Sequence, residues 1–201
     1  KAIWEQVNTC LASDGFTARG LIARSNVELV CTTDAPGDTL EHHRRLKDEF
    51  DVRVIPAFRP DLKKVTPAMV ADIDFFHQNG CRLSDHGLDF VPFTLGDAEA
   101  VFNKVLAGGT ATVEETHIYM TDLLLFFAKE FAKRDWCMQI HVGAIRNNNT
   151  PMYRALGPDT GYDSIAETAI AEPLAKFMDA LEQEDSLPKT ILYSLNPKDN
   201  Y

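Results

Sequence analysis

Residues 136–150 read WCMQIHVGAIRNNNT, an apolar run that carries two polar side chains and stops in a polar loop. The apolar part predicts a strand whose alternate residues fall on two faces. One face carries Met138, Ile140 and Val142, and the other carries Cys137, Gln139 and His141. A strand buried on both faces accommodates Gln139 and His141 only if their polar atoms are hydrogen-bonded or belong to a site.

The loop after this strand favours a functional site over a purely structural role for His141. Gly143 lets the backbone turn closely, while Arg146 and the three asparagines at 147–149 supply charged and amide donors. In α/β folds, ligands bind beyond the carboxyl ends of the strands. A histidine that only hydrogen-bonds the neighbouring backbone is the alternative.

The composition indicates a globular chain with an acidic balance. Its 201 residues, 45% of them hydrophobic, suffice for one core, and the net charge of −10 argues against nucleic acid and anionic membranes as partners. No apolar run approaches the roughly 20 residues that cross a bilayer, and no signal-peptide pattern opens the chain. The four cysteines form no C-x-x-C pair, which favours thiols in a reducing, cytoplasmic compartment.

Four other segments repeat the pattern of a strand followed by polar residues. The five predicted strands are 27–31, 52–58, 81–86, the apolar part of 136–150, and 190–195. Helices are expected at about 39–50, 66–79, 97–107, from 112 onward, and at 165–184, where Pro173 should kink or divide the helix. Residues 1–26 predict a helical lead-in that opens inside or just before a helix, so we expect a fragment of a longer protein.

Strands that alternate with helices predict consecutive βα units of a parallel sheet. We expect a single α/β domain over residues 1–201, a partial (β/α)8 TIM-type barrel of about five consecutive parallel βα units, with the units over 27–201. A doubly wound open sheet is the alternative. The chain contains neither a dinucleotide-binding glycine fingerprint nor a P-loop, which weakens that alternative.

If the strands are parallel, the loops after them bring polar side chains of both charge signs together. These residues are Asp34, Arg59, Asp85, His86, His141, Arg146 and Asn196. A guanidinium can make paired hydrogen bonds to a carboxylate or phosphate, and His and Asp suit proton transfer. Each residue alone can equally brace a turn or form a structural ion pair. His42 and His43 are expected on solvated surface, and His117 is expected to be structural.

Five long motifs carry a specific resemblance to a known family. They are VCTTDAP with LEHHRRL, VRVIPAFRPD, GCRLSDHGLD, MQIHVGAIRNNNTPMYRALGPDTGYDSI and LPKTILYSLNPKDN, in that order over essentially the whole chain. Together they closely resemble the uronate isomerases, also called glucuronate isomerases. The resemblance implies an amidohydrolase-superfamily (β/α)8 barrel that interconverts D-glucuronate with D-fructuronate and D-galacturonate with D-tagaturonate in sugar-acid catabolism. This aldose-ketose isomerisation moves a proton between C2 and C1 and requires a base, an acid and oxyanion stabilisation.

The resemblance also implies roles for single residues. The five strands would be the second to sixth of the barrel, with His141 as the catalytic histidine, Arg59 on the carboxylate of the sugar acid, and His86, Asp34 and Arg146 on the substrate. The family's divalent metal, commonly zinc, is held by a His-x-His pair and an Asp on other strands. This chain contains no His-x-His, so it is assigned no metal ligand. The expected partner is a small-molecule uronate, without nucleic acid or membrane, and homo-oligomerisation is left open.

Two further functions stay open at this level. A metal-dependent hydrolase on the same barrel would cleave amides or esters, and a non-catalytic sugar-acid-binding domain would hold glucuronate without turnover. Between Asp61 and Thr66 the family has a much longer insertion, so either this member lacks it or residues are missing there. The 201-residue chain alone is expected to be inactive, because the family's metal ligands are not in it.

Overall fold

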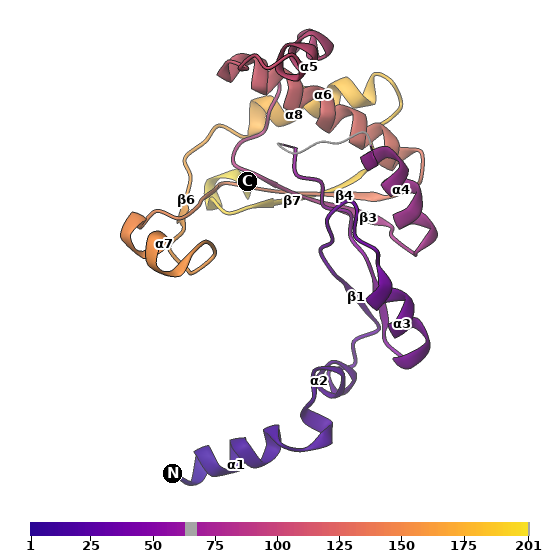
Figure 1. Cartoon of the computed structure of the whole chain (residues 1–201), viewed down its shortest axis with the longest axis vertical. Helices are drawn as coiled ribbons and strands as arrows, with labels where there is room; N and C mark the ends of the chain where they lie inside the picture. Colours follow the sequence, from indigo (N-terminus) through magenta and orange to yellow (C-terminus); the bar gives the residue numbers. More distant parts are fainter. Residues whose placement is uncertain (63–67, 201) are drawn as a thin grey trace.

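The computed structural model describes residues 1–62 and 68–200 and has an α/β fold with parallel strands (Figure 1). The parallel strands follow the chain order and are β1 (Leu29–Cys31), β2 (Arg53–Ile55), β3 (Leu83–Leu88), β4 (Cys137–Val142) and β7 (Lys189–Ser194). β1 pairs with β2, and β4 lies between β3 and β7. Phe58 joins the two sheets through parallel bridges to Asp34 and Ser84. The expectation of an α/β fold with parallel strands is confirmed.

The second predicted strand is shorter than residues 52–58. β2 ends at Ile55, directly before Pro56, which has no N–H to donate to a ladder. The chain then rejoins the sheet at Phe58, whose N donates to Leu83 O and whose O accepts from Asp85 N. After the interruption, the chain lies beside the first residues of β3.

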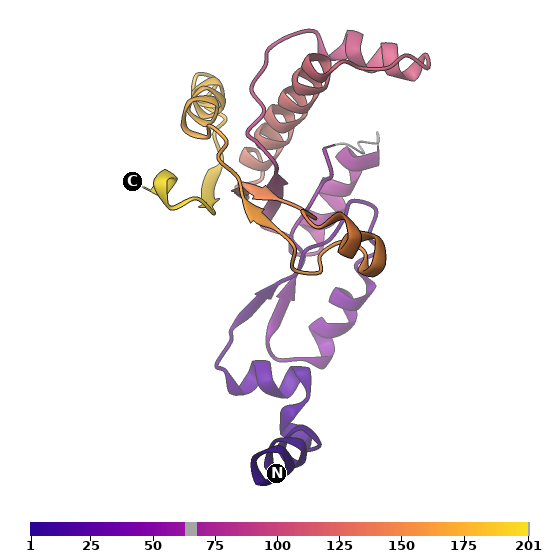
Figure 2. The same cartoon turned by 90° about the vertical axis from the view of Figure 1, so that its left-hand side faces the viewer.

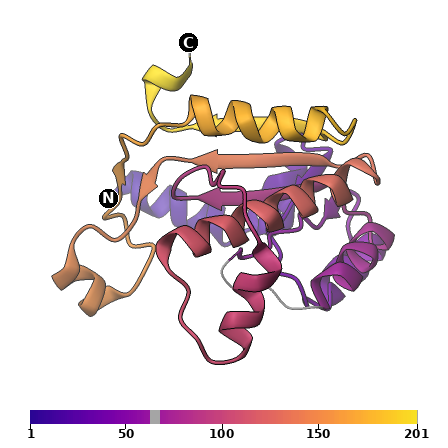
Figure 3. The same cartoon turned by 90° about the horizontal axis from the view of Figure 1, so that it is seen from above.

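Helices cover one face of the β3-β4-β7 sheet (Figures 1 and 3). α6 (Val113–Ala132) packs on β4 and on α8 (Ala171–Glu182), and α5 (Ala98–Leu106) packs on α6. α4 (Ala68–Gln78) adds apolar side chains to the same core. Trp136, Met138 and Ile140 are each no more than 1% exposed beneath these helices, as the alternation of residues 137–142 predicts for the apolar face.

A capping box fixes the start of α6, which begins where the sequence predicts a helix from 112 onward. Thr112 Oγ1 accepts a hydrogen bond from Glu115 N at 3.2 Å, and Glu115 Oε2 accepts one from Thr112 N at 2.7 Å. Asp97 caps α5 in a similar way by accepting from Ala100 N at 2.8 Å. The predicted start of α4 at Thr66 and Pro67 lies outside the described residues.

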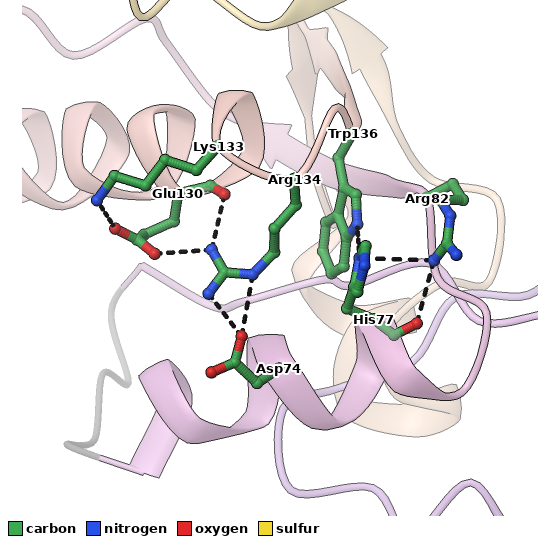
Figure 4. Close-up of polar contacts among 7 residues, drawn as sticks. All are labelled: Asp74, His77, Arg82, Glu130, Lys133, Arg134 and Trp136. Atoms are coloured by element: carbon green, nitrogen blue, oxygen red, sulfur yellow. Dashed lines mark hydrogen bonds and ion pairs between the residues drawn. The ribbon is translucent and has the colours of Figure 1, made fainter.

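A network of polar contacts joins α4, α6 and the amino ends of β3 and β4 (Figure 4). Arg134 donates to Asp74 Oδ1 at 2.6 Å and to Glu130 Oε2 at 2.7 Å. Trp136 Nε1 donates to His77 Nδ1 at 2.9 Å, so the imidazole proton of a neutral His77 lies on Nε2. These contacts lie at the opposite end of the strands from the polar loops and serve the fold.

The first residues are helical and extend away from the sheet beyond β1 (Figures 1 and 2). α1 (Ala2–Leu11), the 310 helix η1 (Asp14–Phe16) and α2 (Ala18–Arg24) precede β1. Several large apolar side chains of α1 face solvent, including Ile3, which is 78% exposed, and Trp4, which is 71% exposed. α3 (Glu41–Glu49) follows β1 and packs against β2.

Three features between β4 and β7 differ from the prediction. Ala144–Ile145 (β5) and Ser164–Ile165 (β6) form a short antiparallel ribbon, and Thr150–Leu156 (α7) is a helix capped by Asn149 (Figure 2). α8 begins at Ala171 and not at 165. Pro173 therefore lies in the first turn of α8, where its missing N–H breaks no intrahelical bond, and the predicted kink is wrong. A 310 helix, η2 (Pro197–Asn200), follows β7.

Candidate functional site

Asp85 is the centre of a charged cluster on the face of the sheet opposite α6. Arg59 Nη1 donates to Asp85 Oδ2 at 3.0 Å, and His141 Nε2 lies 3.2 Å from Asp85 Oδ1. The Asp85 side chain is only 16% exposed, whereas those of Arg59 and His141 are 42% and 34% exposed, so solvent screens these contacts in part. The structure thus brings two of the predicted site residues, Arg59 and His141, together through a third charged group.

The positions of these side chains follow from strand register. Asp85 pairs with Gln139, and Gly87 pairs with His141, so both pairs alternate onto the same face. A Cβ atom on Gly87 would lie 2.8 Å from His141 Cε1 and 3.0 Å from Arg59 Nη2. Arg59 and His141 therefore close over the backbone of Gly87, in space that any side chain there would take.

Three adjoining cavities open onto this cluster. One of about 620 Å³ is lined by Thr33, Arg59 and Gly87 among others, and one of about 520 Å³ by Asp85 and His141 among others. A third, of about 190 Å³, contains Arg59, His141 and Arg146 in its wall. The two larger volumes are in the range of small-molecule sites. A ligand over Gly87 would meet both positive charge and an imidazole.

Arg146 reaches this region from the ribbon that follows β4. Its Nη1 donates to Asp163 Oδ2 at 2.7 Å, and Asn147 N donates to Asp163 Oδ1 at 2.9 Å. The hydrogen bond from Asn147 N and the Arg146 guanidinium lower the pKa of Asp163, which therefore holds the ribbon as a carboxylate. Arg146 thus lines the same cavity as His141 while its own ion pair is with Asp163.

His86 lies on the other face of β3. Its side chain alternates with Asp85, is 1% exposed, and packs 5.6 Å from Phe131 between ring centroids. Its Nε2 is 3.0 Å from Ser84 Oγ, and its buried Nδ1 has no partner among the described residues. Burial, helped by the nearby His141 and Arg59, lowers the pKa of His86 to about 3, so the ring is neutral. The structure does not bring His86 onto the face of Asp85.

Asp34 is engaged by neighbours that the sequence pattern did not connect with it. Thr32 Oγ1 donates to Asp34 Oδ2 at 2.6 Å, and His43 Nε2 lies 2.7 Å from Thr32 Oγ1. The side chain of Asp34 is 12% exposed and that of His43 is 10% exposed. The expectation that His43 lies on solvated surface is therefore wrong, whereas His42 is 73% exposed.

The burial of His43 could have been predicted from its helical spacing. It stands three residues after Leu40 and three before Leu46, on the apolar side of α3. The surrounding charges in LEHHRRL masked that spacing.

The described residues do not fit a complete metal centre. Within 1–62 and 68–200, no group of three or more His, Cys, Asp or Glu side chains is placed to hold an ion. His141 and Asp85 contact one another as an ion pair or hydrogen bond. They supply two groups, whereas a catalytic zinc normally takes three protein ligands.

No helix in the described part of the chain is long and apolar enough to cross a membrane.

A family model for glucuronate isomerase matches residues 1–66 and 62–201. The chain belongs to the glucuronate isomerase family. The two matched pieces meet at 62–66, which is where the resemblance indicated a shortened connection; most of that segment lies outside the described residues.

Relatives of this glucuronate isomerase family member match it over its whole length. It is 45% identical to a uronate isomerase of Caldanaerobacter subterraneus subsp. tengcongensis, over 100% of this chain and 50% of the relative. Two crystal structures share its fold. Uronate isomerase from Thermotoga maritima has a TM-score of 0.79 and 30% sequence identity, over 90% of this chain and 46% of that one. Glucuronate isomerase from Caulobacter crescentus has a TM-score of 0.82 and 27% sequence identity, over 96% of this chain and 46% of that one. The chain thus spans about half the length of the relatives it matches.

Proposed function

We propose that the full-length protein is a uronate isomerase that interconverts D-glucuronate with D-fructuronate and D-galacturonate with D-tagaturonate. The observation that carries the proposal is the coupling of Arg59 and His141 through Asp85, beside a cavity at the carboxyl ends of parallel strands. The family membership and the 45% identity to a uronate isomerase support it.

The parallel strands belong, in this proposal, to a (β/α)8 barrel in which they are the second to sixth strands. The TM-scores of 0.79 and 0.82 to uronate isomerase structures support this assignment. So does the order of pairing, because β1, β2, β3, β4 and β7 follow one another as neighbouring βα units do in a barrel. Among the described strands β1 and β7 each pair on one side only, which leaves two edges for further strands.

Arg59 binds the uronate carboxylate in this proposal. A uronate differs from a neutral hexose by that carboxylate, and a guanidinium held in place by Asp85 presents a planar fork of donors. Because this chain has a net charge of −10, local positive charge favours the binding of an anion. Arg146, in the wall of the cavity shared with His141, adds a second guanidinium to that cavity.

His141 moves the proton between C2 and C1. When its ring is neutral, the contact between Nε2 and Asp85 Oδ1 places the ring proton on Nε2, and Nδ1 carries the lone pair. Asp85 thereby orients the ring and stabilises the imidazolium that forms on proton uptake. Asp34 and His86 support the site from its border, because both are engaged or buried outside the Asp85 cluster.

The divalent metal expected from the resemblance, commonly zinc, has its main ligands outside this chain in this proposal, because the sequence contains no His-x-His pair. The proposed location is the cytoplasm, a compartment that suits the four free cysteines.

The test compares the full-length wild-type protein with Arg59→Met and Arg45→Met, assayed for conversion of D-glucuronate to D-fructuronate by NMR. Loss of the charge-assisted carboxylate contact in Arg59→Met should lower kcat/KM. The corresponding loss of transition-state stabilisation should be about 2 to 4 kcal/mol, with little change in the melting temperature. Arg45 is 62% exposed on α3, and its replacement should leave kcat/KM unchanged.

Three outcomes would contradict the proposal. Unchanged kcat/KM in folded Arg59→Met removes Arg59 from the site. Binding of glucuronate without turnover by the metal-supplemented protein indicates a binding domain, and cleavage of amides or esters in place of isomerisation indicates a hydrolase.

A further inference from the structure

A chain of hydrogen bonds begins at His43 on α3. Its side chain is 10% exposed, and its Nε2 lies 2.7 Å from Thr32 Oγ1, just after the end of β1. Thr32 Oγ1 in turn lies 2.6 Å from Asp34 Oδ2. These distances are short for hydrogen bonds and connect a helix to the loop after the first strand.

The direction of these bonds follows from the number of protons available. A carboxylate at Asp34 only accepts, so the single hydroxyl proton of Thr32 points to Asp34 Oδ2 at 2.6 Å in preference to Ile55 O at 3.3 Å. Thr32 Oγ1 must then accept from His43, which places a proton on His43 Nε2. His43 therefore donates into the group, and only a side chain with a donor at the same position can replace it.

Backbone hydrogen bonds connect Asp34, which Thr32 and His43 hold in place, to Arg59. Asp34 N donates to Ala57 O at 3.0 Å, and Arg59 N donates to Asp34 O at 2.9 Å. The backbone of Arg59 is thus fixed on the residue that Thr32 and His43 hold. The Arg59 guanidinium then reaches Asp85, which contacts His141.

We infer that His43 is a positioning residue that holds Asp34, and through it Arg59, where the substrate carboxylate binds. The inference rests on the proposed function, in which Arg59 binds that carboxylate. His43 lies on a different element from every residue that would touch the substrate, and its own ring is engaged with Thr32. It therefore acts on binding by fixing backbone, without contact to the substrate.

The test uses three variants of the full-length protein: His43→Met, His43→Gln and His42→Met. His43→Met keeps side-chain volume but removes the donor, whereas the amide nitrogen of Gln can stand where Nε2 stands. His42, adjacent on the same helix and 73% exposed, is the matched control. Thermal unfolding is measured beside kcat and KM for D-glucuronate.

His43→Met should lower kcat/KM by about 10-fold to about 100-fold, the scale of an ångström-size displacement of a binding group, and mainly by raising KM. His43→Gln should restore most of this loss. His42→Met should match the wild type. The melting temperature could fall equally in His43→Met and His43→Gln while KM rises only in His43→Met. That result would still support positioning, because the loss of substrate affinity would then not follow the loss of stability.

Several results would overturn the inference. They are an unchanged KM in folded His43→Met, equal losses of kcat/KM in His43→Met and His43→Gln, and a loss of kcat/KM that lies wholly in kcat.

If the wild type does not isomerise uronates, the proposed function fails. Crystal structures of the wild type, His43→Gln and His43→Met then test the inference separately. A displaced Arg59 only in His43→Met supports it, and an unmoved Arg59 overturns it. If His43→Met does not fold, the imidazole 15N spectrum of the wild type decides, because an unprotonated Nε2 on His43 contradicts the bond direction.

Discussion

At the scale of single residues, the absence of a side chain at Gly87 leaves room for Arg59 and His141. Arg59 and His141 come from two different strand ends, and both lie over its backbone, where a Cβ atom would come within 3.0 Å of each. The 2.8 Å distance to His141 Cε1 is shorter than real Cβ contacts, so a side chain there must displace His141, and Arg59 Nη2 at 3.0 Å must give by a few tenths of an ångström. Asp85 can hold the Arg59 guanidinium and the His141 imidazole in one arrangement only while this space is empty.

Gly87→Ala in the full-length protein should therefore lower uronate kcat/KM by about 10-fold to about 100-fold, because the methyl group pushes the Arg59 and His141 side chains apart. Stability should change little, since the displaced atoms are the ends of side chains that face a cavity. Gly15→Ala is the control, because its added Cβ would meet Arg24 Nη1 at an ordinary 3.5 Å. A Gly87→Ala variant as active as the wild type would show that the two side chains do not need this spacing.

At the scale of elements, the long helix α6 depends on its first turn. The reciprocal bonds between Thr112 and Glu115 satisfy two backbone donors that no intrahelical partner can reach. The rest of α6 buries Leu124, Phe127 and Phe131 over the sheet, so the cap fixes an element that covers the core beneath the site.

Thr112→Ala should destabilise the full-length protein by about 1 kcal/mol, measured by urea denaturation, and should leave uronate kcat/KM unchanged. Thr116→Ala is the matched control one turn later. Thr116 is exposed, and its hydroxyl only returns to Thr112 O at 2.8 Å, so its removal should cost little. Equal stability of Thr112→Ala and the wild type would mean that the capping box contributes nothing to folding.

At the scale of the whole molecule, the apolar surface of the 201-residue chain is large for an isolated domain. Ile3, Trp4 and Leu11 of α1 are each more than half exposed, and so is Leu195 beyond β7. Exposed apolar side chains and unpaired strand edges both favour association.

The 201-residue chain alone should therefore be marginally stable or aggregate, should bind zinc no better than a surface histidine, and should not isomerise glucuronate. Sedimentation velocity, zinc titration and the NMR assay measure these three properties. A monomeric chain that unfolds cooperatively would refute the first expectation. Turnover by a chain purified free of host isomerase would require metal and base from residues such as His42, His43 and His86.

The sequence by itself determined the pattern of strands and helices. Largely apolar runs of five to seven residues ending in polar loops identified the parallel strands, because burial on two faces selects such runs. Alternation from Met138 to Val142 placed His141 on the face opposite the core, and the same alternation in LSDHGL separates Asp85 from His86. The ribbon of β5 and β6 escaped prediction because strands of two residues are too short to show a period.

Only the tertiary structure decided which polar side chains meet. Arg59, Asp85 and His141 are separated by tens of residues and touch because parallel register brings three strand ends side by side. His43 looked solvated among charged neighbours, yet the packing of α3 against β2 turns it onto Thr32. Local sequence specifies which face a residue occupies, whereas contact between distant residues depends on how whole elements pack, and no short pattern encodes that.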